Sequence, residues 1–322
     1  MGMQRTERIE GFIREIWRWY DRHKRVLPWR DMECMNEDER AYRVLVSEVM
    51  LQQTQVSRTK VIFRTFLEQF PSIDVLAAAS NKDVLLMWRG MGYNNRALRL
   101  RDAAKVIIEQ YNGVFPRGMK ELQALPGLGH YTAAAVRNFA FDLPTPCLDT
   151  NIRRILHRVF VGPERQDGTW LKNDRYLLSI AEQALVVALS SSGRTAADWH
   201  AALMDYGSIV CTRRNPQWGV CPLTRAGLMK AAYRTPSIIK ARRRCEPGRA
   251  MAGRFIPNRI FRGKIVEELR DAPAGLALNE LGSRVSIDWS PREHCAWLRS
   301  ILSSLIADRL LMERRGKYVL CE

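Results

Sequence analysis

Apolar side chains recur at helical spacing along most of this chain, and this periodicity constrains the fold more than any other feature. Ile9, Phe12 and Ile16 follow one another at steps of three and four residues, the spacing of one face of an α-helix. The same spacing predicts helices over 43–56, 59–70, 82–88, 95–111, 131–141, 150–160, 173–190 and 196–210. Short connectors separate them, and no long β-alternating run appears. We therefore expect an all-α domain over residues 1–235, with two helical lobes and the N-terminal helix packing with the second lobe.

The pattern changes in the last part of the chain. Residues 236–256 are rich in arginine and contain proline and glycine, which indicates a basic linker. Residues 257–322 are interpreted as a separate small domain. Its predicted helices cover 259–269, 278–285 and 292–307, and a strand, a tight Arg-Arg-Gly-Lys turn and a second strand follow. Three helices closed by a hairpin predict a winged-helix-like domain, and a generic helical cap with a terminal hairpin is the alternative.

The charge balance is strongly basic. The chain of 322 residues has 51 Lys and Arg against 34 Asp and Glu, a formal net charge of +17, which predicts a polyanionic partner. The charge alone does not distinguish between DNA, RNA and an anionic membrane as that partner. The N-terminal segment carries charges throughout, and no stretch approaches the roughly 18 apolar residues of a membrane span. We expect an intracellular protein whose 7 cysteines are thiols or metal ligands.

A glycine-containing turn joins two predicted helices at residues 125–132, which read Leu-Pro-Gly-Leu-Gly-His-Tyr-Thr. Gly127 and Gly129 allow backbone N–H groups to approach a phosphate closely, and the N-terminus of the following helix favours an anion. A tight helix–helix turn is the plain alternative, and it is common for a lone Gly-x-Gly. The longer string, with Leu128 between the glycines and Thr132 after them, is far more specific for a helix-hairpin-helix.

One carboxylate lies inside a strongly apolar predicted helix. Glu48 has Val46 and Val49 as close sequence neighbours. Burial raises the pKa of a carboxyl group and makes it a usable acid near neutral pH. A glutamate that points to solvent is the alternative, and that is the usual position of this residue type. The amides of Gln52 and Gln53 follow directly, and amides beside an apolar helix suit hydrogen bonding to base edges.

A second carboxylate precedes a predicted helix. Asp149 occupies the N-cap position before residues 150–160, where Asp is preferred for structural reasons alone. The structural and functional interpretations are compatible, because the N–H groups of a helix N-terminus stabilise an ionised carboxylate. We expect these hydrogen bonds to hold Asp149 ionised, and a fixed carboxylate can stabilise a developing sugar cation.

Together these motifs resemble the helix-hairpin-helix DNA glycosylase superfamily and, within it, the adenine DNA glycosylase (MutY) branch. The resemblance covers about residues 9–225. Its motifs appear in the family's order as LPWR at 27–30, SEVMLQQTQV at 47–56, GMGYNNRALRL at 90–100, LPGLGHYTAAAV at 125–136 and LDTNIRRIL at 148–156. The resemblance implies the two-lobed helix-hairpin-helix glycosylase fold. It also implies an enzyme that flips a base out of duplex DNA and hydrolyses its N-glycosidic bond.

The resemblance implies catalytic roles for three matching residues. Glu48 matches the general acid that protonates the departing base, and Asp149 matches the carboxylate that stabilises the oxocarbenium-like state. Tyr131 stands where lyase-type relatives carry the Schiff-base lysine. A phenol cannot form that imine, so the resemblance implies a monofunctional enzyme.

Contacts with DNA and with the flipped base are implied in the same way. Residues that wedge into the base stack match Gln53, Met91 and Tyr93. The complete set of expected contact residues is Trp29 and Arg30 in the pocket wall, Gln52, Gln53, Met91, Tyr93, Gly127, Leu128, Gly129 and Thr132.

The cysteine pattern departs from the family. The resemblance implies an iron–sulfur cluster held by Cys-x6-Cys-x2-Cys-x5-Cys, but only Cys211 and Cys221 occupy positions of that pattern. Trp218 and Gly227 stand at the other two, and Cys245 is too distant to be a substitute. Because a four-thiolate cluster needs four ligands, we expect no cofactor and no metal, with Trp218 filling the space as core.

Two further departures concern the substrate. Adenine-specific relatives can carry Glu or Gln at the position that matches Ala201, next to His200, so Ala201 weakens the argument for adenine. The adenine branch typically adds a Nudix-like domain that reads 8-oxoguanine. Residues 257–322 are too few and too helical to be one, so that recognition does not carry over.

The sequence therefore predicts a monofunctional, clusterless DNA glycosylase for mismatched or damaged double-stranded DNA. We expect a cytoplasmic, nucleoid-associated monomer with no membrane partner. Adenine is the favoured target base, because the Gln-Gln-Thr-Gln segment leans toward it. Thymine or uracil opposite guanine is the runner-up, because related mismatch glycosylases share Tyr and Asp at the equivalent positions. A non-catalytic DNA-binding regulator is the third possibility, but a mere binder has no need of Glu48 and Asp149 near phosphate.

Overall fold

The computed structural model describes residues 4–30, 33–34, 36–234 and 246–322. The chain divides into two compact units, each assembled from separate stretches of sequence. Unit 1 comprises Met1–Leu45, Pro116–Ala124 and Leu128–Arg242, and unit 2 comprises Val46–Phe115, Leu125–Gly127 and Arg243–Glu322. The predicted C-terminal domain thus groups with the helices that follow Val46.

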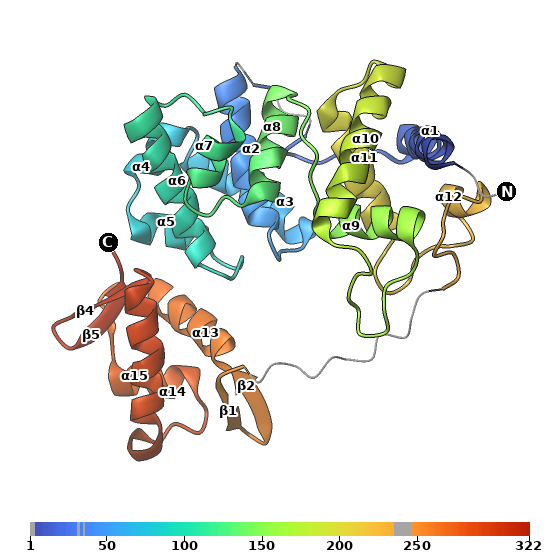
Figure 1. Ribbon diagram of the computed structural model, residues 1–322. Coiled ribbons are helices and arrows are strands. Elements are labelled where there is room, and N and C mark those ends of the chain that lie inside the picture. Colours follow the sequence, from blue (N-terminus) through green and yellow to red (C-terminus); the bar gives the residue numbers. More distant parts are fainter. Residues whose placement is uncertain (1–3, 31–32, 35, 235–245) are drawn as a thin grey trace. The chain divides into compact units, whose positions relative to one another are not determined.

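Unit 1 is helical in its described part (Figure 1). Its elements are α1 (Arg5–His23), the first part of α2 (Glu37–Leu51), α7 (Met119–Ala124), α8 (His130–Phe141), α9 (Thr150–Leu156), a one-turn π-helix η1 (His157–Val161), α10 (Asp174–Ser192), α11 (Ala196–Ile209) and α12 (Pro222–Arg225). The predicted helix over 150–160 therefore changes from α to π geometry at His157, where the N–H of Gly162 donates to the His157 carbonyl over 2.9 Å.

Aromatic side chains fill the core of unit 1. The apolar face of α1 buries Phe12 and Trp17 against α10 and α11. The Phe12 ring lies 5.5 Å from the ring of Phe160 and 5.8 Å from that of Trp199, both edge to face. Among the described residues no single helix is long and apolar enough to cross a membrane. The bent pair α10 and α11, with 117° between them, passes the same length and composition test, and both helices contribute to this core.

Unit 2 begins with helices. The end of α2 leads into α3 (Val56–Gln69), α4 (Ile73–Ala78), α5 (Asn81–Met87) and α6 (Asn95–Tyr111). Helix α6 ends in the left-handed residue Asn112, with a φ of 53°, and Gly113 continues the turn with a φ of 81°. Helices α3, α5 and α6 confirm the helices predicted over 59–70, 82–88 and 95–111, whereas α4 was not predicted and α2 ends earlier than expected.

The C-terminal part of unit 2 mixes helices and short strands (Figure 1). Its elements are β1 (Gly248–Met251), β2 (Arg254–Pro257), α13 (Asn258–Arg270), β3 (Leu276–Ala277), α14 (Leu278–Val285), α15 (Pro291–Ala307), β4 (Leu311–Arg314) and β5 (Lys317–Leu320). Helices α13, α14 and α15 correspond to the three predicted helices, and β4 and β5 form the predicted terminal hairpin. Strand β5 lies between β3 and β4 in an antiparallel sheet. The winged-helix assignment itself stays a prediction.

The basic linker predicted over 236–256 is partly wrong. Residues 235–245 lie outside the described residues, but β1 and β2 form an antiparallel hairpin where linker was expected. Ala252 and Gly253 make its turn with φ values of 49° and 72°, the paired positive angles of a type I′ two-residue turn. An Ala-Gly pair is a weak turn signal, so the charge of this stretch hid the hairpin.

Candidate functional site

Glu48 is a buried carboxylate in unit 2. It lies on α2 with 7% of its surface exposed, and its neighbours Val46, Val49 and Met50 are buried as well. The structure therefore confirms that Glu48 is buried and does not point to solvent. A carboxyl group in such surroundings is suited to hold or donate a proton.

Asp149 lies in unit 1, at the N-terminus of α9. Its Oδ1 accepts the N–H of Ile152 over 2.5 Å, and its Oδ2 accepts the side-chain amide of Asn151 over 2.9 Å. Burial raises the pKa of the Asp149 carboxyl above its ordinary value, although these hydrogen bonds and the charge of Arg154 act in the opposite direction. The predicted cap is thus confirmed, while burial and these hydrogen bonds act on the pKa of the carboxyl in opposite directions.

Tyr131 stands in the first turn of α8, also in unit 1. Its hydroxyl donates to the Met204 sulfur at 4.0 Å, and its side chain packs against the core of unit 1 while staying partly exposed. The next residue, Thr132, is buried. A phenol in this place can donate a hydrogen bond, but it offers no amine for covalent attack.

The predicted hairpin joins α7 to α8. Gly127 has a φ of +80°, and a Cβ added there would lie 2.9 Å from the Cβ of Arg99, so only glycine suits this position. Gly129 is the N-cap of α8, and a Cβ added to it would meet nothing within 4 Å. Leu128 between them is buried. The arrangement leaves open space at the N-terminus of α8, where an anion is favoured.

The glutamine segment ends α2 early, which corrects the predicted helix over 43–56. Helix α2 stops at Leu51, and α3 begins at Val56. Between them Gln53 has a φ of +56°, and its side chain is exposed. Gln52 is half-buried. A left-handed residue cannot continue an α-helix, so this segment is a turn that presents Gln53 outward.

The loop after α5 carries the other two expected wedge residues, Tyr93 and Met91, of which one is exposed and the other is buried. Tyr93 has a φ of +46° and a side chain that is 53% exposed. Met91 is only 4% exposed, which conflicts with a wedge role for its side chain. Of the three expected wedge residues, Gln53 and Tyr93 are therefore available at the surface and Met91 is not.

Arg96 joins the turn and the loop, and sequence reasoning missed it. Its Nη1 donates to the carbonyls of Val49 at 2.8 Å and Met50 at 3.1 Å, and also to that of Gln52. Its Nη2 donates to Thr54 Oγ1 at 3.0 Å and to the carbonyls of Met91 and Gly92, both at 3.1 Å. Burial lowers the pKa of Arg96 to about 10, which still leaves the guanidinium charged at neutral pH. The available signal was an arginine at the start of the helix predicted over 95–111, directly after GMGYNN.

Arg30 and Trp29, expected in a pocket wall, are largely buried in unit 1. Arg30 forms a two-pronged ion pair with Asp205 of α11, over 2.8 and 2.9 Å. Arg25 also donates to Asp205, over 2.6 Å from its side chain and 3.0 Å from its backbone. Asp205 is fully buried, so these two arginines compensate its charge. Arg30 is thus committed to a structural ion pair, while Trp29 is 7% exposed.

Ala201 and His200 lie next to each other on α11, and both are buried. The Nδ1 of His200 is 2.8 Å from the carbonyl of Ala196. Burial lowers the pKa of His200 to about 4, so the ring is neutral near pH 7. Neither residue presents a charged group.

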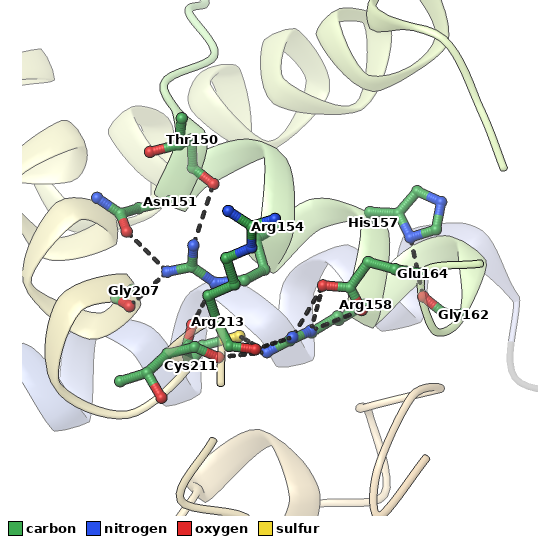
Figure 2. A network of polar contacts seen from close by, with 11 residues as sticks. Thr150, Asn151, Arg154, His157, Arg158, Gly162, Glu164, Gly207, Cys211 and Arg213 are labelled. Carbon is green, nitrogen blue, oxygen red and sulfur yellow. Dashed lines mark hydrogen bonds and ion pairs between the residues drawn. The ribbon is translucent and has the colours of Figure 1, made fainter. Parts of the chain in front are cut away.

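Both cysteines of the reduced pattern have polar contacts, and Figure 2 shows the network around Cys211. The Arg158 guanidinium lies 2.8 Å from Glu164 Oε1, 2.7 Å from the Thr212 carbonyl and 3.7 Å from Cys211 Sγ. The Cys221 sulfur is 2.8 Å from the Tyr206 hydroxyl. Burial raises the pKa of the Cys211 thiol, against the opposing charge of Arg158.

Trp218 packs against the core of unit 1 but stays partly exposed, and the Arg158 guanidinium lies 5.6 Å from its ring centroid. The buried Arg158–Glu164 pair was not expected from the sequence. In the part of the chain that the structure describes, no group of three or more His, Cys, Asp or Glu side chains could hold a metal ion. Cys245 lies outside the described residues.

Comparisons with known proteins agree on one superfamily. Residues 46–174 match the HhH-GPD superfamily of base excision DNA repair proteins. An adenine DNA glycosylase of Mycolicibacterium smegmatis is 34% identical over 307 residues, which cover 95% of this chain and 94% of that protein. The human adenine DNA glycosylase is 34% identical over 247 residues, 76% of this chain and 42% of that protein.

Solved structures give the same fold. A thermostable thymine-DNA glycosylase superimposes with a TM-score of 0.59 and 27% identity, covering 70% of this chain and 96% of that one. A trapped covalent intermediate of endonuclease III with DNA gives a TM-score of 0.55 at 21% identity, over 71% and 98% of the two chains. These similarities confirm the expected helix-hairpin-helix glycosylase fold.

Proposed function

This chain belongs to the adenine DNA glycosylase family, and from that premise we propose that it hydrolyses the N-glycosidic bond of a base flipped out of mismatched duplex DNA, with adenine as the target. The observation that carries the proposal is the burial of Glu48 in the apolar helix α2, directly before the glutamine turn. A buried carboxyl at that place is equipped to act as an acid.

In this mechanism Glu48 donates a proton to a ring nitrogen of the flipped base. Protonation makes the base a neutral leaving group, and the bond between it and the sugar breaks toward an oxocarbenium-like state. The base leaves with the electrons of that bond. Water then adds to the sugar carbon and gives a proton to the Glu48 carboxylate, so the product is an abasic site and the acid is restored.

Asp149 stabilises the positive charge that develops on the sugar. The N–H of Ile152 and the amide of Asn151 fix the orientation of its carboxylate, which is a preorganised arrangement. Tyr131 offers no amine, so no imine forms between protein and sugar and the strand is not cut. The enzyme is therefore monofunctional.

Double-stranded DNA is the partner of this site. Backbone N–H groups of the hairpin at Gly127, Leu128 and Gly129 contact a phosphate, and Thr132 supports the same turn. Gln53 and Tyr93 enter the base stack where the flipped base leaves it. The protein acts as a monomer in the cytoplasm, associated with the nucleoid. Residues 257–322 form a winged-helix-like module.

We propose that no iron–sulfur cluster is bound. A four-thiolate cluster needs four cysteines, and the family positions hold Cys211, Trp218, Cys221 and Gly227. The donor set does not fit the cluster. The ion pair of Arg158 with Glu164, which reaches the Cys211 sulfur, supports a structural role for this network.

The target base has a second candidate. The similarity to a thymine-DNA glycosylase, and Ala201 at a position where adenine-specific relatives can carry Glu or Gln, favour thymine or uracil opposite guanine. A panel of duplexes with single mismatches or lesions, treated with enzyme and then alkali, decides between them. We expect adenine release to be fastest. Faster release of thymine or uracil opposite guanine would replace adenine as the target, and release of no base would favour a DNA-binding regulator.

A further inference from the structure

The C-terminal segment of the chain is docked on the helices of unit 2. Leu85 of α5 and Leu98 of α6 belong to the same buried cluster as Phe261 and Ile265 of α13. The shared cluster means that α13 is a fixed part of the unit rather than a tethered appendage.

A buried arginine fixes α13 beside the loop that carries Tyr93. The Nε of Arg270 donates to the Leu85 carbonyl over 2.9 Å, and its Nη2 donates to Asn94 Oδ1 over 3.1 Å. Arg270 is only 6% exposed. Surface contacts add to this docking, such as that of Arg89 with Asp271 at 2.5 Å. Helix α13 therefore has a defined position relative to the candidate wedge residues.

A groove of about 750 Å³ lies between these elements. One wall is formed by the turn at Gln52 and Gln53, by residues 90–95 and by the start of α6, and the other by α13. The exposed side chains of Tyr93 and Ile260 line it, so its surface is partly apolar.

The groove is basic on both walls. Besides the buried Arg96, its basic lining residues are Arg58, Arg99, Arg259, Arg262 and Lys264, and its acidic lining residue is Glu267. Arg99 is exposed, and within the described part of the chain its guanidinium has no hydrogen-bond or ion-pair partner. The ion pair of Arg259 with Glu246 is half exposed and therefore weak. Lys264 is exposed, and its Nζ donates one hydrogen bond to the Val285 carbonyl over 3.2 Å, so the ammonium keeps further N–H donors for an anion. Arg58 and Arg262 are engaged with Gly90 and with Ser304 and Asp308, so Arg99, Arg259 and Lys264 are the cations best placed to meet an anionic ligand.

We propose that this groove binds the sugar–phosphate backbone of the duplex next to the wedge residues, with Arg99 on one wall and Arg259 and Lys264 on the other as phosphate contacts. The inference rests on the proposed function and adds a DNA-binding role for α13. It also implies that the C-terminal module contacts DNA through the face of α13 that lines the groove. Arg292 and Arg299 of helix α15 are exposed, and neither of them lines the groove.

The salt dependence of DNA binding tests this assignment. Dissociation constants for a mismatched duplex are measured between about 0.05 and 0.2 M salt. Each lost phosphate contact is expected to reduce the slope of log affinity against log salt by about 0.9, so R259Q/K264Q should lose about 1.8 and R99Q about 0.9. Thermal unfolding identifies any variant that fails to fold. If R259Q/K264Q does not fold, R99Q on the opposite wall still tests the proposal.

The double variant R292Q/R299Q is the matched control, because it removes the same charge from the same module outside the groove. It should keep the wild-type slope. A wild-type slope in R259Q/K264Q and R99Q, or a lower slope in R292Q/R299Q alone, would overturn the proposal. Base release by the wild-type protein is scored separately. Its absence would contradict the proposed function, while the slopes would still decide whether the groove binds DNA.

Discussion

At the scale of single residues, two glutamates of α2 lie in opposite surroundings. Glu48 is buried among apolar side chains, whereas Glu39 is partly exposed and pairs with Arg43 on the helix surface. We expect E48Q to lower single-turnover base release by about a hundredfold to ten-thousandfold, the usual contribution of general acid catalysis. Duplex binding should persist, because glutamine keeps the shape of the side chain.

The variant E39Q is the matched control and should retain wild-type base release, since Glu39 pairs with Arg43 on the helix surface and has no proposed role in the reaction. Both variants are compared at saturating enzyme on one adenine mismatch. If E48Q releases the base at nearly the wild-type rate, Glu48 is not the general acid.

Arg96 makes a second prediction at this scale. Its guanidinium donates to carbonyls of α2, the glutamine turn and the loop of Tyr93, so one side chain orders three segments. We expect R96Q to reduce the free energy of unfolding by roughly 3 kcal/mol, because buried acceptors lose charged partners. Denaturant unfolding measures this change, with R64Q on the exposed face of α3 as control. A loss no larger than that of R64Q would remove the organising role.

At the scale of elements, helix α11 carries a buried histidine whose titration should be visible. The folded-state pKa of His200 is about 4, below its ordinary value of 6.5, because burial disfavours the charged ring. Burial of the neutral ring therefore leaves the free energy of unfolding at its full value above about pH 6.5. That free energy decreases as the pH falls toward 4, because the unfolded chain binds a proton that the folded chain does not. The linkage amounts to about 3 kcal/mol over that window.

The comparison that isolates this effect is the difference in unfolding free energy between wild type and H200Q. As the pH falls from about 6.5 to about 4, the wild type should lose stability relative to H200Q, since glutamine does not titrate. A difference that is independent of pH would mean that His200 titrates normally.

Helix periods were readable from the sequence, but the ends of elements depended on single backbone angles. The helix predicted over 43–56 was carried through the polar segment 52–55, whereas the left-handed Gln53 ends the helix near Leu51. The hairpin β1–β2 was hidden because its turn is Ala-Gly within a charged stretch. Helix α9 was placed correctly by its Asp149 cap, yet its π-turn at His157 has no sequence signal that we recognise.

At the scale of the whole molecule, motif residues could be predicted and their supporting contacts could not. Glu48 was expected to be buried and is, because its helix is apolar all around it. Met91 was expected to wedge into the base stack, but it is buried, and its backbone carbonyl accepts a hydrogen bond from Arg96. The docking of α13 depends on Arg270 reaching Leu85 and Asn94, which are far away in sequence. Such long-range partners follow from packing and not from periodicity.

The intact protein is predicted to contain no iron. Cys211 and Cys221 are the cysteines left in the family pattern, and Arg158 lies beside the first of them. Protein purified without oxygen should be colourless and hold far less than one iron per chain by elemental analysis. A four-cysteine relative prepared in the same way is the positive control. A broad absorbance in the visible range with stoichiometric iron would refute the clusterless assignment.

The fate of the DNA strand after base release tests the central claim most directly. Wild-type protein and D149N, which keeps a good N-cap residue at α9, are incubated with a labelled adenine mismatch, with and without later alkali. We predict free adenine, an intact strand before alkali and a cut strand after it for the wild type, with release at least about a hundredfold slower for D149N. Absence of free base, or a strand cut before alkali together with borohydride trapping of the protein on DNA, would contradict a monofunctional DNA glycosylase.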